Sequence, residues 1–119
     1  MNSETNISKS KVLAKAVFNL AEQLQLKDSE LALILGISET ELSLTLKEDG
    51  LDPNAAEGER ALTLVCIYRE LFSLNGGDLN WMRRFIDSPN RLLNHQTPRS
   101  LMQTEKGLKK VLHLVEWLQ

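Results

Sequence analysis

Residues 28–47 read DSELALILGISETELSLTLK, and this stretch decides the fold expected for the first half of the chain. Asp28 or Ser29 can cap a short helix over about residues 30–35. Gly36 can end that helix, because glycine readily takes the left-handed conformation that follows a last helical turn. The stretch is therefore expected to begin with a short helix and a tight turn.

A second short helix follows the turn. Ser38 can cap it, and Glu41, three residues on, completes a capping box, so we expect the helix to continue to about Glu48. Small Ala32 lets the two helices cross closely. The apolar residues expected to fill their shared core are Leu31, Leu35, Ile37, Leu42 and Leu46. This spacing predicts a helix-turn-helix motif.

The rest of the chain also reads as helix, so we expect an all-α fold. Aromatic residues make up only 5% of the chain, and no stretch alternates as a half-buried strand does. A helix over about residues 10–26 should bury a stripe formed by Leu13, Val17, Leu20 and Leu24. The stretch DGLDPNAAEG, residues 49–58, is the clearest linker. We therefore divide the chain into a helix-turn-helix region, residues 1–53, packed against a second helical domain, residues 54–119.

The second domain is expected to contain several helices. A long apolar helix over about residues 59–74 carries Leu62, Val65, Tyr68, Leu71 and Phe72. The residues expected to cap the later helices are Asp78, Thr97 and Thr104. Pro98 follows Thr97 at a first helical position, where its missing N–H is not needed.

Charge is distributed unevenly along the chain, which has a net charge of −2. Residues 1–60 carry a net charge of −5, and residues 61–119 carry +3. Between Asp28 and Glu59 there are nine acidic residues and one basic residue, Lys47. This asymmetry predicts different partners for the two halves, or complementary packing between copies.

The helix-turn-helix raises the question of DNA binding, because the second helix of such motifs reads bases in the major groove. Here that helix offers no Arg, Asn or Gln for bidentate contact to a base, and its acidic surroundings repel phosphate. The candidates for DNA contact are Ser38, Thr40, Ser43, Lys47, Lys11 and Lys15. We expect weak DNA binding at best; the alternative is a motif kept as a scaffold or a protein contact.

Several functional classes lack support in the sequence. Cys66 is expected to be a small core residue, and His95 and His113 lie too far apart, without ligand-spaced neighbours, for a metal site. No phosphate-binding loop and no Ser/His/Asp arrangement is present, so we expect neither an enzyme nor a cofactor. No apolar run is long enough to span a membrane, and the N-terminal residues lack the apolar core of a signal peptide. A cytoplasmic protein is therefore expected.

Three motifs in the second half carry a family resemblance. They are L-x-L-V-x-I-Y-R-E-L-F-S-L-x-G-G, W-M-x-x-F-x-x-S-P-N-x-x-L and P-x-x-L-M-x-T-x-x-G-L-x-x-V, in that order. The matching residues are Tyr68, Arg69, Leu71, Gly76, Trp81, Pro89, Asn90, Leu93, Pro98, Leu101, Thr104, Gly107 and Val111. Over roughly residues 60–118 the chain resembles the toxin-binding domain of the Xre/MbcA/ParS antitoxins, and a helix-turn-helix precedes it as in Xre-type members.

Physical arguments explain several of these positions as determinants of the fold. Pro98 starts a helix, Gly107 lets two helices approach closely, and Trp81 is large enough to organise a small core. The motifs therefore identify the scaffold more directly than they identify a binding surface.

The resemblance implies the antitoxin of a type II toxin–antitoxin system, paired with a RES-type toxin. Such toxins resemble ADP-ribosyltransferases and consume NAD, so catalysis would belong to the partner. The antitoxin would form a homodimer, cover the NAD pocket of the toxin and, as a complex, repress its own promoter. Family members often extend past the last helix into the toxin; here the sequence ends at Gln119, so inhibition is expected to use the helix end or another surface. The alternative functions are a stand-alone transcriptional regulator and a structural interaction protein.

The basic second half supplies candidates for toxin contact. They are Arg84, Asn90, Arg91, Arg99, Lys106, Lys109, Lys110 and Trp117. The basic residues are expected to form either a solvated face or a surface for an acidic partner, which can be the toxin or the acidic half of another copy. Trp117 is expected to be a contact anchor rather than part of the core.

Overall fold

The computed structural model of the chain describes residues 2–45, 47 and 50–119, with side chains from residue 9 onward in these ranges. Its helices are α1 (Asn2–Gln23), α2 (Asp28–Leu35), α3 (Glu39–Leu44), α4 (Ala56–Leu74), α5 (Leu79–Asp87), the 3-10 turn η2 (Arg91–Leu93), α6 (Pro98–Leu101) and α7 (Glu105–Trp117). In these ranges the β-structure is a single bridge between Asn90 and Gln96. The predicted all-α class is confirmed.

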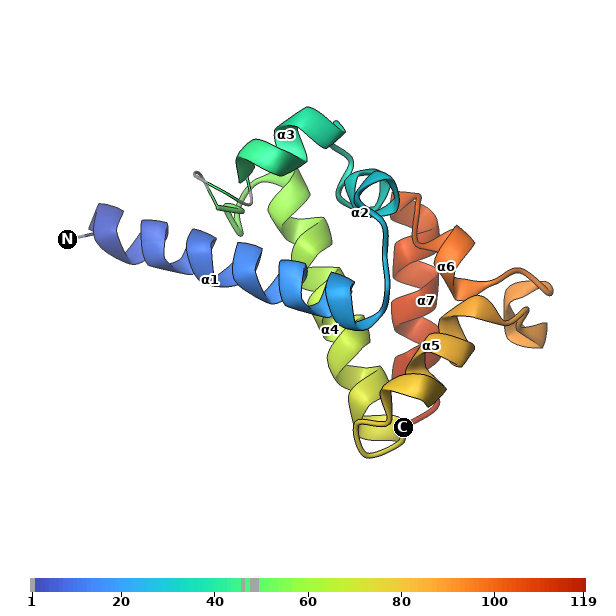
Figure 1. Cartoon of the computed structure of the whole chain (residues 1–119). Helices are drawn as coiled ribbons and strands as arrows, with labels where there is room; N and C mark the ends of the chain where they lie inside the picture. The colour runs from blue at the N-terminus through green and yellow to red at the C-terminus, as the bar shows by residue number, and fades with distance from the viewer. Residues whose placement is uncertain (1, 46, 48–49) are drawn as a thin grey trace.

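Helix α4 lies at the centre of the molecule, where it packs against α1, α2 and α7. Helix α6 packs against α7, α5 packs against α6 and α4, and the N-terminal part of α1 extends away from the other helices (Figure 1). None of the helices in the described part of the chain is both long and apolar enough to cross a membrane. Because α4 contacts both halves, the helix-turn-helix and the later helices share one hydrophobic core.

The core contains the stripe predicted for the first helix. Leu13, Val17, Leu20 and Leu24 are all buried. The predicted core of the helix-turn-helix is buried at Leu31, Leu35 and Leu42, whereas Ile37 is half-buried. Leu46 and Glu48, the expected last core residue and the expected end of the second short helix, lie outside the described residues.

The capping box of the helix-turn-helix forms as predicted. The Ser38 Oγ accepts a hydrogen bond from the Glu41 N–H at 3.1 Å, and the Glu41 carboxylate accepts one from the Ser38 N–H at 3.3 Å. Gly36 ends α2 with a left-handed φ of +74°. These contacts end α2 and begin α3.

The predicted cap of α2 is wrong. Asp28 and Ser29 both lie inside the helix, and Lys27 occupies the capping position. The Lys27 N–H donates to the Glu30 carboxylate at 3.1 Å, so an acidic side chain within the first turn replaces the side-chain cap. The start of the helix therefore depends on Glu30.

Helix α4 buries only part of the face expected: Leu71 is in the core, and Val65 and Tyr68 pack against it. Its buried residues are Gly58, Ala61, Leu64, Ile67 and Leu71. Cys66 is exposed, so its predicted place in the core is wrong. Since each residue turns a helix by about 100°, Cys66 cannot share a face with both Leu64 and Ile67. Leu62 and Phe72, on the predicted apolar face, are partly exposed.

The predicted caps of the later helices are confirmed. The side chains of Asp78, Thr97 and Thr104 accept hydrogen bonds from backbone N–H groups within the first turns of α5, α6 and α7. A Cβ atom at Gly107 would lie 1.9 Å from the Leu101 carbonyl oxygen, so only glycine allows this approach between α6 and α7.

Candidate partner-binding surfaces

Helix α7 presents a basic and aromatic stripe on its outward side. Lys106, Lys110, His113 and Trp117 are all exposed and follow one another at helical spacing. The opposite side of the helix packs into the core. Trp117 is 73% exposed, so it is not a core residue, and its role as a contact anchor stays a prediction. We refer to these four residues as the α7 stripe.

An apolar groove lies beside the α7 stripe. It has a volume of about 460 Å³ and runs between α7 and the loop that contains η2. Its apolar lining comprises Leu92, Leu93, Leu101, Leu114 and Trp117. Leu92, on one rim, is 61% exposed, and Trp117 is exposed on the other. A large apolar side chain from a partner that entered the groove would bury apolar area of both residues.

The polar lining of the groove includes one lysine, Lys110. Lys110 and His113 contribute from α7, and Asn94 and Gln96 contribute from the loop. None of the described residues that line the groove is acidic. The site therefore favours a ligand that combines an apolar side chain with a carboxylate.

The loop that forms one wall of the groove is held by Asn90. Its side-chain oxygen accepts a hydrogen bond from the Leu92 N–H at 2.9 Å, and its N–H donates to the Gln96 carbonyl at 3.1 Å. Asn90 thus positions Leu92, whereas the neighbouring Arg91 is exposed. Both residues were candidates for toxin contact, and the structure places them next to the groove.

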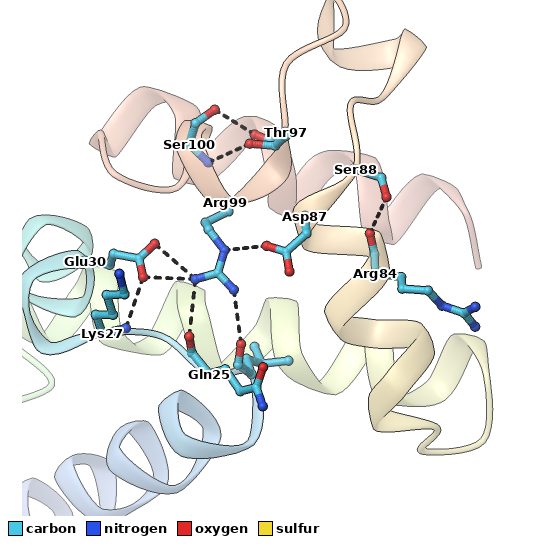
Figure 2. Close-up of polar contacts among 10 residues, drawn as sticks. Gln25, Lys27, Glu30, Arg84, Asp87, Ser88, Thr97, Arg99 and Ser100 are labelled. Carbon is cyan, nitrogen blue, oxygen red and sulfur yellow. Dashed lines mark hydrogen bonds and ion pairs between the residues drawn. The ribbon is translucent and has the colours of Figure 1, made fainter.

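Arg99 has a different environment from the other toxin-contact candidates, as Figure 2 shows. Its Nη1 lies 3.0 Å from both carboxylate oxygens of Glu30, and its Nε lies 2.6 Å from Asp87 Oδ1. It also donates to the carbonyl oxygens of Leu24 and Gln25. These bonds join α6 to the end of α1, the start of α2 and the end of α5.

The charge of Arg99 is stabilised by this network. Burial acts to lower its pKa, but the hydrogen bonds and charges of Asp87 and Glu30 act in the opposite direction, and its pKa is raised. Its donors are thus engaged within the chain.

The remaining two toxin-contact candidates, Arg84 and Lys109, lie elsewhere. Arg84 points away from the Arg99 network (Figure 2), and the Lys109 ammonium is 3.5 Å from the Glu105 carboxylate on α7.

The candidates for DNA contact divide between two places. Ser38, Thr40 and Ser43 are exposed on α3 and its cap. Lys11, Lys15 and Lys47 come together around a hollow of about 330 Å³, together with Phe18. The lysines therefore form a compact basic site on the α1 side of the helix-turn-helix. Lys11 and Lys15 lie on successive turns of α1, and Lys47 follows them by 36 and 32 positions in the sequence.

The exposed residues of α3 include acidic and apolar side chains. Glu39 and Glu41 are exposed, and Leu44 is 50% exposed. Within α3, Leu42 is the residue that is buried. This surface is unsuited to phosphate and is suited to a basic, apolar partner.

Comparisons with known proteins assign both halves of the chain. The family model for the antitoxin Xre/MbcA/ParS C-terminal toxin-binding domain matches residues 69–119, and the model for the antitoxin Xre-like helix-turn-helix domain matches residues 7–65. The chain belongs to the Xre/MbcA/ParS antitoxin family. The groove, the α7 stripe and the Arg99 network all lie within, or reach into, the toxin-binding domain of this antitoxin.

The fold of this antitoxin is also found in a solved structure. It superposes with a TM-score of 0.65 on a chain of the crystal structure of the M. tuberculosis MbcT-MbcA toxin–antitoxin complex. The two chains are 24% identical, and the match covers 90% of this chain and 93% of the other. No curated protein matches this antitoxin significantly.

Sequence reasoning missed several residues of these surfaces. Leu92 and His113 line the groove, and Phe18 lies beside the lysine site. Each of these residues is apolar or aromatic and lies outside the stripe of core residues predicted for its helix. That position was the available signal for a surface residue, but the sequence could not show which such residues another element would cover. Among the described residues, no group of three or more His, Cys, Asp and Glu could hold a metal ion.

Proposed function

We propose that this antitoxin binds and neutralises a RES-like toxin, an ADP-ribosyltransferase-like enzyme that consumes NAD. The observation that carries the proposal is the match of residues 69–119 to a toxin-binding domain, within which α7 exposes a basic and aromatic stripe. Inhibition is steric: this chain covers the NAD pocket of the toxin, and catalysis belongs to the toxin. The expected location of the complex is the cytoplasm.

The α7 stripe and its groove supply the contacts in this proposal. An exposed tryptophan such as Trp117 loses a large apolar area to water when a partner covers it, which is typical of residues that dominate binding energy. Lys106 and Lys110 attract an acidic toxin surface and speed its association. Arg99 acts indirectly, because its bonds hold α6 against the helix-turn-helix.

Growth rescue tests the proposal. A RES-like protein, which the proposal expects to be encoded beside this antitoxin, is expressed alone, with the antitoxin and with its Trp117→Ala variant. The proposal expects arrest with the toxin alone, rescue with the antitoxin and weaker rescue with the variant. Phe18→Ala is the matched control, because it removes an exposed aromatic side chain from the other half and should leave rescue intact. Failure of the unaltered antitoxin to rescue growth contradicts the proposal.

A second candidate function is DNA binding, either by a stand-alone regulator or by the toxin–antitoxin complex at its own promoter. The clustering of Lys11, Lys15 and Lys47 supports it, because three cations in one site can contact successive phosphates. A gel shift at low salt with promoter DNA tests it. If the unaltered chain shifts the DNA, the K11E/K15E variant should no longer do so. The K109E control, altered in the other half of the chain, should still shift the DNA.

A further inference from the structure

Two hollows on the helix-turn-helix half adjoin each other and differ in charge. The first has a volume of about 330 Å³, and none of its described lining residues is acidic. The second has a volume of about 330 Å³ and contains Asp28 and Glu39. Phe18 and Lys47 line both hollows, so together they form one site with a basic end and an acidic end. Both hollows are in the size range of small-molecule sites.

Helix α1 presents the basic end and the aromatic residue on one side. Lys11, Lys15 and Phe18 follow one another at spacings of four and three residues, so they share one side of the helix. The core stripe that begins at Leu13 lies on the other side. Phe18 is 44% exposed, so it offers open apolar surface between the two hollows.

The carboxylates of the acidic end take no part in the helix caps. Asp28 lies in the first turn of α2, but the start of that helix uses Glu30. Glu39 lies in the first turn of α3, which is capped by Ser38 and Glu41. Both Asp28 and Glu39 are exposed. The caps therefore leave both carboxylates available to accept hydrogen bonds from a ligand.

A nucleotide carries groups that match the two ends of this site. Lysines neutralise phosphates, and a base stacks on an aromatic side chain. A carboxylate accepts hydrogen bonds from N–H groups on the edge of a base. Guanine offers two adjacent donors, on N1 and on its amino group, whereas the amino group of adenine stands beside an acceptor nitrogen. A carboxylate therefore favours guanine over adenine.

We propose that this site binds a free guanine nucleotide. The base stacks on Phe18 with its donor edge toward Asp28 and Glu39, and the phosphates lie among the three lysines of the basic end. The site lies in the other half of the chain from the toxin-binding domain, so the inference goes beyond the proposed function. The nucleotide occupies the lysines that the second candidate function assigns to DNA, so the two ligands exclude one another.

Three variants divide the site into its parts. Phe18→Ala removes the stacking surface. The D28N/E39Q variant removes the charged acceptors, and the K11E/K15E variant reverses the basic end. All five positions are exposed, so none of these substitutions alters the core.

Two further variants are matched controls. The K106E/K110E variant changes the net charge by the same amount as K11E/K15E, at two exposed positions of α7. Val12→Ala removes an exposed apolar side chain from another side of α1. Circular dichroism and thermal unfolding show that each variant is folded.

Isothermal titration calorimetry measures the binding of GTP, ATP and inorganic triphosphate at one ionic strength. The unaltered chain and both controls should bind GTP, and should bind ATP and triphosphate at least about tenfold more weakly. Phe18→Ala should weaken GTP binding about tenfold and leave triphosphate binding unchanged. The D28N/E39Q variant should bind GTP no more tightly than ATP. The K11E/K15E variant should bind none of the three ligands.

The pattern of affinities decides the proposal. Preference for GTP that depends on the stacking surface and on the carboxylates supports it. Absence of GTP binding by the unaltered chain overturns it, and so does equal affinity for GTP and triphosphate, because the site then binds any polyanion. Tighter binding of a guanine-free single-stranded oligonucleotide than of GTP also overturns it, in favour of a nucleic-acid backbone. Growth rescue does not depend on these outcomes and tests the proposed function separately.

Discussion

Arg99 and Glu30 join the two halves of this antitoxin, because one guanidinium nitrogen lies 3.0 Å from both carboxylate oxygens. The same Glu30 carboxylate accepts the Lys27 N–H at the start of α2. One acidic residue therefore both begins a helix of the helix-turn-helix and ties it to α6 in the toxin-binding domain. Mutation of either partner is expected to loosen both regions.

Replacement of Arg99 should destabilise the whole fold. The Arg99→Ala variant removes the guanidinium that Glu30 and Asp87 share, although Glu30 keeps the Lys27 N–H, and we expect the free energy of unfolding to fall by about 2 kcal/mol. Arg99→Lys should recover only part of this loss, because an ammonium cannot reach two carboxylates and two carbonyls in one plane. Urea unfolding measures the free energy of unfolding of both variants. Equal stability of the lysine variant and the unaltered protein would contradict this role.

The two caps of the helix-turn-helix should respond differently to mutation. Ser38→Ala removes a side-chain acceptor and should lower the free energy of unfolding by about 1 kcal/mol. Lys27→Ala should cost little, because Lys27 contributes only its backbone N–H to the start of α2. Thermal unfolding of both variants measures the two losses of stability for comparison. A larger loss for Lys27→Ala than for Ser38→Ala would refute the observed assignment of the caps.

Gly107 should tolerate no side chain. In Gly107→Ala, the new Cβ would lie 1.9 Å from the Leu101 carbonyl oxygen, so α6 and α7 must separate. We expect a loss of about 2–3 kcal/mol of stability from this overpacking. Lys106→Ala, one residue earlier and exposed, is the control and should have little effect. An unchanged unfolding midpoint for Gly107→Ala would show that the helices do not approach so closely.

Cys66 should react in the folded protein. Because its side chain is exposed on α4, a thiol reagent such as Ellman's reagent should label it without denaturant. The measurement is the rate of labelling with and without urea. Labelling that occurs only after unfolding would place Cys66 in the core, as the sequence had indicated, and would contradict the observed face of α4.

The helix-turn-helix was predictable because its signals are local. Gly36, Ser38 and Glu41 act within one or two turns of backbone, and the structure keeps all three roles. Helix ends in the second domain were predictable for the same reason, through Asp78, Thr97 and Thr104. Each of these residues specifies a helix end whatever the rest of the chain does.

The surfaces were less predictable because they depend on distant contacts. Arg99 was grouped with the other basic residues, but Glu30 and Asp87 lie 69 and 12 positions away from it. Cys66 and Leu62 look apolar in the sequence, yet α1, α2 and α7 cover the other face of α4. Single-helix periodicity cannot rank two apolar faces when the neighbours that decide between them are unknown.

The proposed function requires that this antitoxin bind a RES-like toxin in the cell. The most direct measurement is to tag the chain in its own host, purify it gently and identify the proteins that accompany it by mass spectrometry. We expect a RES-like protein in stoichiometric amount, and a smaller amount of that protein when the tagged chain carries Trp117→Ala. Recovery of the unaltered chain without such a protein, while the neighbouring toxin is expressed, would contradict the claim.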